Sequence, residues 1–264
     1  MDFTPFLLLE MSLKKNIFIT GATSGIGKAC AEKFAQNNAR LILTGRRKDK
    51  LESIQKELNK KYACEVLTLE YDIQKKDALN PFLDTIQLFA PHIDLLINNA
   101  GLALGKDNFE DASFDDWDTM IDTNVKGLYY TTKALLPFIK KSSDPYIINM
   151  SSIAGSEVYE NGNAYCASKF AVNAFSKAMK VDFLKYLIRV TNVCPGAVET
   201  EFSNVRFKGD IEKAKSIYKG YQPLIAEDIA DVVYYCSQLP KHINIQDLVI
   251  TPTAQANSFN LLRN

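Results

Sequence analysis

The chain has 264 residues, of which 47% are hydrophobic, and its 31 lysines and arginines are balanced by 31 aspartates and glutamates. A chain of this length and composition can bury the core of one large globular domain. Its formal net charge of zero produces no overall field that would attract nucleic acid or an anionic membrane surface, so we expect neither as a partner.

Residues 1–13 begin with a short apolar run, and we expect them to form a poorly ordered N-terminal extension. They lack a basic region, and the run is too brief for a signal peptide or a membrane span. Met11 offers an alternative start to Met1. No later apolar run reaches spanning length, and the five cysteines are an odd number with no Cys-x-x-Cys pair. These features predict a cytoplasmic protein without a disulfide framework or a metal site.

Short apolar runs alternate with amphipathic stretches along the rest of the chain. We predict strands at residues 16–20, 41–44, 66–71, 94–97, 146–150, 188–193 and 248–250. We predict helices up to about residue 38, at about 48–61 and 117–140, and around Tyr165. Continuous apolar strands separated by helices indicate a parallel sheet covered on both faces. With right-handed crossovers, residues 14–264 are expected to form one α/β domain, a Rossmann-type doubly wound sheet of about seven strands.

A glycine-rich turn, Thr20-Gly21-Ala22-Thr23-Ser24-Gly25-Ile26-Gly27, joins the first predicted strand to the first helix. Its glycines permit a tight turn, a close approach of the backbone to a pyrophosphate, and close packing of the helix on the sheet. The N-terminus of the helix offers N–H groups and a partial positive charge to phosphate oxygens. The spacing is not the G-x-G-x-x-G form, and a purely structural turn is the alternative. The candidate cofactor-binding residues of this turn are Gly21, Thr23, Ser24, Gly25, Ile26 and Gly27.

The end of the second predicted strand indicates which dinucleotide is bound. An NAD site usually has an acidic residue about twenty residues after the glycine turn, where it binds the ribose 2′-hydroxyl. This strand instead ends in Thr44-Gly45-Arg46-Arg47. Two guanidinium groups suit a 2′-phosphate, although a pair of surface arginines at a helix start would give the same pattern. We therefore predict NADP, with Arg46 as the main phosphate contact and Arg47 as support.

Tyr165 and Lys169 are four residues apart, so on a helix their side chains project from the same face. A free phenol has a pKa of about 10 and is a poor base at neutral pH. A fixed cation favours the phenolate, so we expect Lys169 to lower the pKa of Tyr165 and to let it exchange a proton with an alcohol oxygen. Ser152 lies thirteen residues before Tyr165, just after a predicted strand.

Together these motifs resemble those of the classical short-chain dehydrogenases/reductases, over nearly all of the chain from Lys14 onward. The matching motifs are residues 20–27, Asp72-Ile73, Asn98-Asn99-Ala100-Gly101, Asn124, Ser152, Tyr165 with Lys169, and residues 195–200. The resemblance implies that Tyr165 is the general acid/base and that Lys169 both lowers its pKa and binds the nicotinamide ribose. It also implies that Ser152 holds the substrate oxygen and that Asn124 anchors a water in a proton relay.

The resemblance also implies cofactor contacts outside the glycine turn. Asp72 and Ile73 are expected to frame the adenine, and Asn99 to lie by the adenosine ribose. The residues expected to flank the nicotinamide are Pro195, Gly196, Val198 and Thr200. Family members are commonly tetramers, which predicts a homotetramer built on the helix near Asn124 and the helix that carries Tyr165.

The C-terminal half narrows the resemblance to the bacterial NADP-dependent 3-hydroxy acid dehydrogenases, which oxidise serine, allo-threonine and related acids or reduce malonic semialdehyde. The similar runs are residues 204–210, residues 239–245 and Thr251-Pro252. Residues 199–222 are the least regular stretch and follow a strand end, where α/β folds bind ligands, so we expect them to form a lid. Arg206 and Lys208 bring positive charge to this lid. Arg206 is the candidate contact for a substrate carboxylate, unless both are solvent-facing loop charges.

Two other functions are compatible with these motifs. An NADPH-dependent carbonyl reductase of another ketone or of an acyl thioester would use the same Asn124, Ser152, Tyr165 and Lys169. A non-catalytic NADP(H) sensor would bind the cofactor without turnover, but such proteins typically lose a catalytic group. All four groups are present here. We therefore predict an enzyme that acts on a small 3-hydroxy acid substrate.

Overall fold

The computed structural model describes residues 14–264, so the predicted extension at residues 1–13 lies outside the described residues. Seven strands form one sheet in the order β3-β2-β1-β4-β5-β6-β9, and every neighbouring pair is parallel. Their bounds are β1 Asn16–Ile19, β2 Arg40–Gly45, β3 Val66–Glu70, β4 Leu95–Asn98, β5 Tyr146–Met150, β6 Arg189–Pro195 and β9 Asp247–Ile250. This topology confirms the predicted doubly wound parallel sheet of seven strands.

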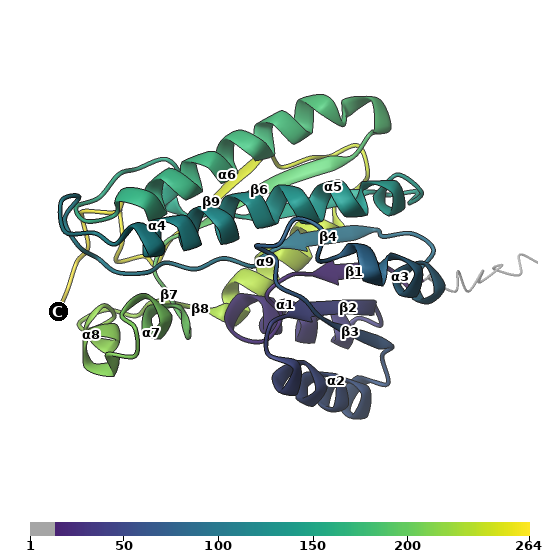
Figure 1. Cartoon of the computed structure of the whole chain (residues 1–264), viewed down its shortest axis with the longest axis horizontal. Helices are drawn as coiled ribbons and strands as arrows, with labels where there is room; N and C mark the ends of the chain where they lie inside the picture. Colours follow the sequence, from purple (N-terminus) through teal and green to yellow (C-terminus); the bar gives the residue numbers. More distant parts are fainter. Residues whose placement is uncertain (1–13) are drawn as a thin grey trace, which may run out of the picture.

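Helices cover both faces of this sheet, as Figure 1 shows. Their bounds are α1 Gly25–Gln36, α2 Lys48–Tyr62, α3 Leu83–Phe89, α4 Phe114–Ile121, α5 Gly127–Ile139, α6 Asn163–Asp182, α7 Phe202–Arg206, α8 Ile211–Ser216 and α9 Ala226–Gln238. Shorter elements are the helical turns η1 Asn80–Phe82, η2 Asp122–Lys126, η3 Ile153–Gly155 and η4 Leu184–Tyr186, and the paired strands β7 Val198–Glu199 and β8 Leu224–Ile225.

In the inner strands of the sheet, alternate side chains enter two different cores. In β1, Ile17 and Ile19 pack with apolar residues of α1, α2 and α9, whereas Phe18 packs with those of α3, α5 and α6. All three side chains are fully buried. Burial on both faces explains why the strands are continuous apolar runs in the sequence.

The helical region predicted at residues 117–140 is confirmed, but it is not one regular α-helix. A π-helical turn, η2, separates α4 from α5. It contains Asn124, which is buried. Apolar side chains continue at helical spacing on both sides of this turn, so the sequence pattern does not reveal the extra residue. Such single π turns are frequent at functional sites.

Residues 199–222 are more regular than predicted, because they contain β7, α7 and α8. The Asp210 carboxylate caps α8 by accepting the N–H of Lys213 at 3.0 Å. Just before α7, the Thr200 hydroxyl accepts the N–H of Phe202 at 3.2 Å. The helix α9 was also missed. It follows this segment and packs against α1. In Figure 1, α7 and α8 lie beside β7 and β8, at one side of the main sheet.

The cysteines and the hydropathy of the helices can be described for residues 14–264. The five cysteines, Cys30, Cys64, Cys166, Cys194 and Cys236, are all buried and unpaired with one another. Between residues 14 and 264, we find no helix that combines the length and the hydropathy needed to cross a bilayer.

Candidate active site

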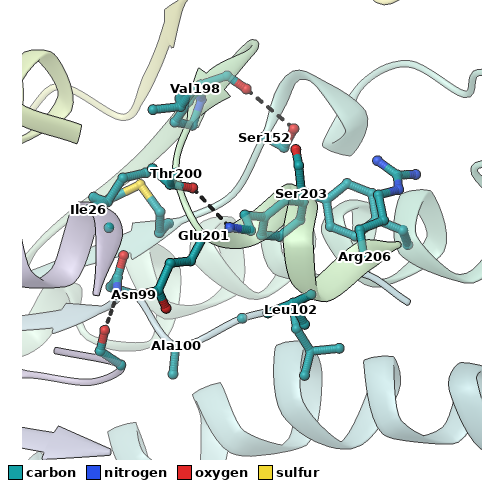
Figure 2. Close-up of a pocket in the computed structure, with 18 of the residues that line it drawn as sticks. Ile26, Asn99, Ala100, Leu102, Ser152, Val198, Thr200, Glu201, Ser203 and Arg206 are labelled. Carbon is teal, nitrogen blue, oxygen red and sulfur yellow. Dashed lines mark hydrogen bonds between the residues drawn. The ribbon is translucent and has the colours of Figure 1, made fainter. Parts of the chain in front are cut away.

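A cavity of about 680 Å³ opens at the carboxyl ends of the parallel strands. Figure 2 shows it, with Ile26 and Asn99 on one side and Ser203 and Arg206 on the other. The predicted site residues that line it are Gly21, Thr23, Ser24, Gly25, Ile26, Arg46, Arg47, Asp72, Ile73, Asn99, Ser152, Tyr165, Lys169, Pro195, Gly196, Val198, Thr200 and Arg206. Gly27 and Asn124 lie outside the lining of this cavity.

Backbone conformation and packing explain the three glycines of the turn between β1 and α1. Gly21 and Gly25 have φ angles of 64° and 51°, in the left-handed region that favours glycine. A Cβ atom on Gly27 would overlap the carbonyl of Gly21 and the side-chain amide of Asn99. Because Gly25 and Ile26 line the cavity, α1 presents its N-terminus and partial positive charge there, as a phosphate requires.

Arg46 and Arg47 both reach the cavity from the end of β2, but they are held differently. Arg47 donates to the Thr23 hydroxyl at 3.1 and 2.8 Å, to the Ser24 hydroxyl at 2.9 Å and to the Glu201 carboxylate at 2.9 Å. The Arg47 guanidinium holds the pKa of Glu201 below its ordinary value. Arg46 is exposed, and its guanidinium donates to no other described residue. The donors of Arg46 are therefore available to a ligand, whereas those of Arg47 are largely engaged.

Three further predicted cofactor contacts, Asp72, Ile73 and Asn99, also line the cavity. Asp72 and Ile73 follow β3. The side chain of Asn99 donates to the carbonyls of Thr20 and Gly21 at 3.0 and 3.1 Å. Asn99 therefore braces the glycine turn in addition to lining the cavity.

The helix α6 places Tyr165 and Lys169 on one wall, facing Ser152 at the start of η3. Tyr165 is 9% exposed and Lys169 is 5% exposed. The Lys169 ammonium lies 5.8 Å from the centre of the Tyr165 ring and donates to the carbonyl of Met150 at 3.0 Å. The Ser152 hydroxyl donates to the carbonyl of Pro195 at 3.3 Å and accepts the N–H of Ala154 at 3.1 Å. The three side chains that the sequence spacing singled out thus line the same cavity.

Burial has a larger effect on the pKa of Tyr165 than any neighbouring charge. Burial raises the pKa of Tyr165 well above its ordinary value, and the cation that opposes this rise is Arg206, assisted by the hydrogen bond from Ser152. Burial also lowers the pKa of Lys169 to about 8, so this ammonium carries its charge less firmly than expected. The prediction that Lys169 lowers the pKa of Tyr165 counted the charge of Lys169 and omitted the cost of removing both side chains from water, and the effect of Lys169 on Tyr165 beside a bound NADP stays a prediction.

Asn124 contacts the site from behind the cavity wall. Its side-chain oxygen accepts the N–H of Leu102, and its amide donates to the carbonyl of Leu102, both at 2.8 Å. The same amide donates to Ser168 at 2.9 Å. A Cβ atom on Gly101 would lie 3.2 Å from the Asn124 oxygen and 3.4 Å from the Lys169 nitrogen, so Gly101 leaves room between these two groups.

Arg206, the last residue of α7, lies on the opposite side of the cavity from the glycine turn (Figure 2). Its guanidinium donates to the Tyr159 hydroxyl at 2.7 Å and to the carbonyl of Gly105 at 3.4 Å. The guanidinium carbon lies 5.4 Å from the centre of the Tyr159 ring and 5.3 Å from that of the Tyr165 ring. Arg206 is therefore an integral part of the cavity wall.

Two sets of ion pairs fasten residues 199–222 to the rest of the chain. Near one end, Glu201 bonds both Arg47 and Lys50, at 2.9 and 3.1 Å. Near the middle, Lys208 bonds Asp116 at 2.7 Å. The charge of Lys208 is therefore directed to α4 and away from the cavity.

Asn173 is a site-supporting residue that the sequence analysis missed. Its side-chain oxygen accepts from Ser151 at 2.5 Å and from Asn192 at 2.9 Å, and its amide donates to the carbonyl of Gly155 at 2.8 Å. It therefore joins α6 to both ends of the loop that carries Ser152. The sequence feature that could have identified Asn173 is its position eight residues after Tyr165 on the same helix.

Tyr159 and Glu201 were also missed. Tyr159 reaches Arg206 across 47 positions of the chain, and Glu201 reaches Arg47 across 154. Neither contact has a local sequence signature. Within residues 14–264, no group of three or more His, Cys, Asp or Glu side chains is arranged to hold a metal ion.

Comparisons with known proteins agree with this geometry. A family model described as short chain dehydrogenase matches residues 15–210. The chain is 42% identical over 241 residues to the NADP-dependent 3-hydroxy acid dehydrogenase of Salmonella typhi, a match that covers 91% of this chain and 96% of that protein. It is 40% identical over 241 residues to sulfoacetaldehyde reductase 2 of Chromohalobacter salexigens, covering 91% of this chain and 95% of that protein.

A similar solved structure is the closed form of serine dehydrogenase complexed with NADP+. It matches this chain with a TM-score of 0.87 and 40% sequence identity, and the match covers 94% of this chain and 100% of that one. Fold and sequence therefore indicate the same set of relatives.

Proposed function

Because this chain belongs to the short-chain dehydrogenase family, we propose that it is an NADP-dependent oxidoreductase of a small 3-hydroxy acid. One observation carries the proposal. A single cavity has Ser152, Tyr165 and Lys169 on its wall, cations for a 2′-phosphate near one end, and Arg206 on the opposite side. A dinucleotide phosphate and a carboxylate substrate are thereby recognised by separate charges.

The residues that line the cavity fit NADP. The N-terminus of α1, with Gly21 and Gly25 in left-handed conformations, would hold the pyrophosphate. Arg46 has unused donors for the 2′-phosphate. Asp72, Ile73 and Asn99 would border the adenosine, while the residues that would border the nicotinamide are Pro195, Gly196, Val198 and Thr200. When bound, NADP supplies the hydride chemistry.

The protein's own contribution to the reaction is to place and move a proton. Ser152 would donate a hydrogen bond to the substrate oxygen, and Tyr165 would take the hydroxyl proton during oxidation or return it during reduction. Lys169 would bind the ribose hydroxyls beside Tyr165. Asn124 would connect this wall, through Ser168 and the backbone of Leu102, to a water that relays the proton.

The substrate's acid group would bind Arg206. Arg206 is held by Tyr159 and Gly105, and the charge-assisted contact would strengthen as residues 199–222 close over the substrate and exclude water. We propose that residues 14–264 act as one domain and that residues 199–222 are its lid. A relative named for sulfoacetaldehyde favours a second candidate, reduction of a small sulfonate aldehyde, because a sulfonate would meet the same guanidinium.

We propose a homotetramer whose contacts include an apolar groove between α5 and α6. The groove is lined mainly by Tyr129, Leu136, Phe175, Met179 and Phe183. Light scattering on the purified protein would measure the assembly mass. Leu136→Asp should reduce that mass, whereas Phe109→Asp, at an exposed apolar residue outside the groove, should not. A monomeric wild type would overturn this part.

The substrate assignment is tested by an NADP+-reduction screen. The panel contains serine, allo-threonine, 3-hydroxyisobutyrate, 3-hydroxypropionate and neutral alcohols of similar size, with sulfoacetaldehyde in the reverse direction. The 3-hydroxy acids should give the highest kcat/KM. Arg206→Met should raise KM for the acids by about tenfold, as loss of one charge-assisted contact predicts, and leave KM for NADP+ unchanged. Equal losses for acids and neutral alcohols would reject Arg206 as the acid contact.

A further inference from the structure

Arg206 is packed against the phenol that we propose as the general acid/base. Its guanidinium carbon lies 5.3 Å from the centre of the Tyr165 ring, closer than the Lys169 ammonium at 5.8 Å. A guanidinium has five N–H donors and carries its charge across the working pH range. Its position therefore places a permanent positive charge beside Tyr165.

The position of this charge is fixed by two neighbours from separate parts of the chain. The Tyr159 hydroxyl accepts from the guanidinium at 2.7 Å, and the carbonyl of Gly105 accepts at 3.4 Å. The backbone of Arg206 is also held, because its carbonyl accepts the N–H of Gly105 at 2.9 Å. The guanidinium is thus clamped between the Tyr159 and Tyr165 rings.

The other titratable groups around Tyr165 supply less charge. On α6, burial lowers the pKa of Lys169 to about 8 and raises the pKa of the Cys166 thiol. From the preceding loop, Tyr159 faces the ring, and burial raises its pKa, so it is neutral at working pH. Lys106 lines the same cavity but is exposed to solvent, which screens its charge.

We propose that Arg206 has a second role as the positioning residue that stabilises the phenolate of Tyr165, with Tyr159 holding it in place. The proposal rests on the assignment of Tyr165 as the general acid/base. An opposite charge within about 4–6 Å typically shifts a titration by about one to three units. Because Arg206 ends α7, the docking of α7 on the Gly105 loop lets Tyr165 ionise, and so accept a proton, at a lower pH. The proposed lid then completes the proton-transfer site and closes it in the same movement.

The test measures the ionisation of Tyr165 without using turnover. The protein is labelled at the ring carbon that bears the tyrosine hydroxyl, and its NMR signal is titrated with saturating NADP+ and no substrate. The Tyr165→Phe variant identifies the signal of Tyr165. Arg206→Met should move the midpoint of that signal upward by about one unit or more, or out of the accessible range. Arg206→Lys should move it less, because a cation remains.

Two variants separate this role from a general effect of the lid. Lys208→Met removes the same charge from the same segment, but Lys208 pairs with Asp116, so the midpoint should stay within about 0.2 units because distant charges are screened. Tyr159→Phe keeps the ring and removes the hydroxyl that accepts from Arg206. It should move the midpoint in the same direction as Arg206→Met, by a smaller amount.

Kinetics give an independent readout with a neutral alcohol, which has no acid group for Arg206 to bind. In oxidation, the rising limb of kcat against pH should move to higher pH in Arg206→Met, while the Kd for NADP+ stays constant. An unchanged Tyr165 midpoint in Arg206→Met, or an equal shift in Lys208→Met, would overturn the proposal. Retention of wild-type rate in Tyr165→Phe would instead reject the proposed function itself.

Discussion

The choice between NADP and NAD offers a direct test of the charges at the end of β2. Arg46→Ala removes a guanidinium that is exposed, lines the cavity and donates to no other described residue. The substitution should therefore leave the protein's own contacts intact. Arg47→Ala is the matched comparison. It removes the same charge one position away, but from a side chain already bonded to Thr23, Ser24 and Glu201.

The size of the effect follows from the donors available. A charge-assisted hydrogen bond contributes about 1.5–3 kcal/mol, and exposure of Arg46 favours the lower end. A loss of about 1.4 kcal/mol is tenfold in affinity, so the Kd for NADP+ should rise about tenfold in Arg46→Ala. Arg47→Ala should raise the Kd for NADP+ less, by roughly threefold, because the charge of Arg47 acts on the phosphate mainly at long range through solvent. NAD+ has no 2′-phosphate, so its Kd should change by less than about twofold in either variant.

Isothermal titration calorimetry at fixed ionic strength provides both constants. Raising the salt concentration should reduce the difference in the Kd for NADP+ between wild type and Arg46→Ala, because salt screens exposed charges. The assignment would be refuted if NADP+ and NAD+ lost affinity equally, or if the wild type bound both equally. A larger loss in Arg47→Ala than in Arg46→Ala would transfer the main contact to Arg47.

Three further predictions concern the helix α6. Tyr165→Phe should lower kcat by at least about a hundredfold with little change in NADPH binding by fluorescence; a residual rate above about a tenth would contradict the acid/base role. Burial lowers the pKa of Lys169 from 10.5 to about 8, so its charged form costs folding free energy below pH 8, and that cost fades as pH rises from 8 to 10.5. Urea unfolding measures this effect: between pH 8 and 10.5 the free energy of unfolding of the wild type should rise relative to that of Lys169→Met. Equal dependence of the two free energies on pH would refute the prediction. Asn173→Ala should lower kcat about tenfold while the Kd for NADP+ stays constant, since the bonds lost hold the Ser152 loop and Asn192 of β6 and none reaches the glycine turn; a parallel loss of both would indicate a purely structural role.

Much of the fold was predictable because its signals are local. The strands of the sheet are buried on both faces, so β1 and β5 stand out as apolar runs between polar segments. The glycine turn and the four-residue spacing of Tyr165 and Lys169 are equally local. Each depends on the conformation of a few neighbouring residues, which the sequence specifies directly.

What could not be predicted depends on contacts between distant residues or on burial. The clamp on Arg206 joins it to Gly105 and Tyr159, 101 and 47 positions away. The sequence placed Lys169 beside Tyr165 correctly but gave no measure of how deeply both are buried, and burial dominates the pKa of each. The π turn at Asn124 was hidden because the helical pattern continues on either side of it.

The bridge from Glu201 to Arg47 and Lys50 has a kinetic consequence. One carboxylate at the start of α7 holds the proposed lid to the same arginine that lies on the glycine turn. If residues 199–222 close as proposed, this bridge would form at the edge of the cavity part that is expected to hold the dinucleotide. A cofactor that arrives before closure is enclosed, and one that arrives afterwards must wait for the bridge to open. If residues 199–222 act as the proposed lid, the arrangement would favour compulsory-order kinetics, in which the dinucleotide enters first and leaves last.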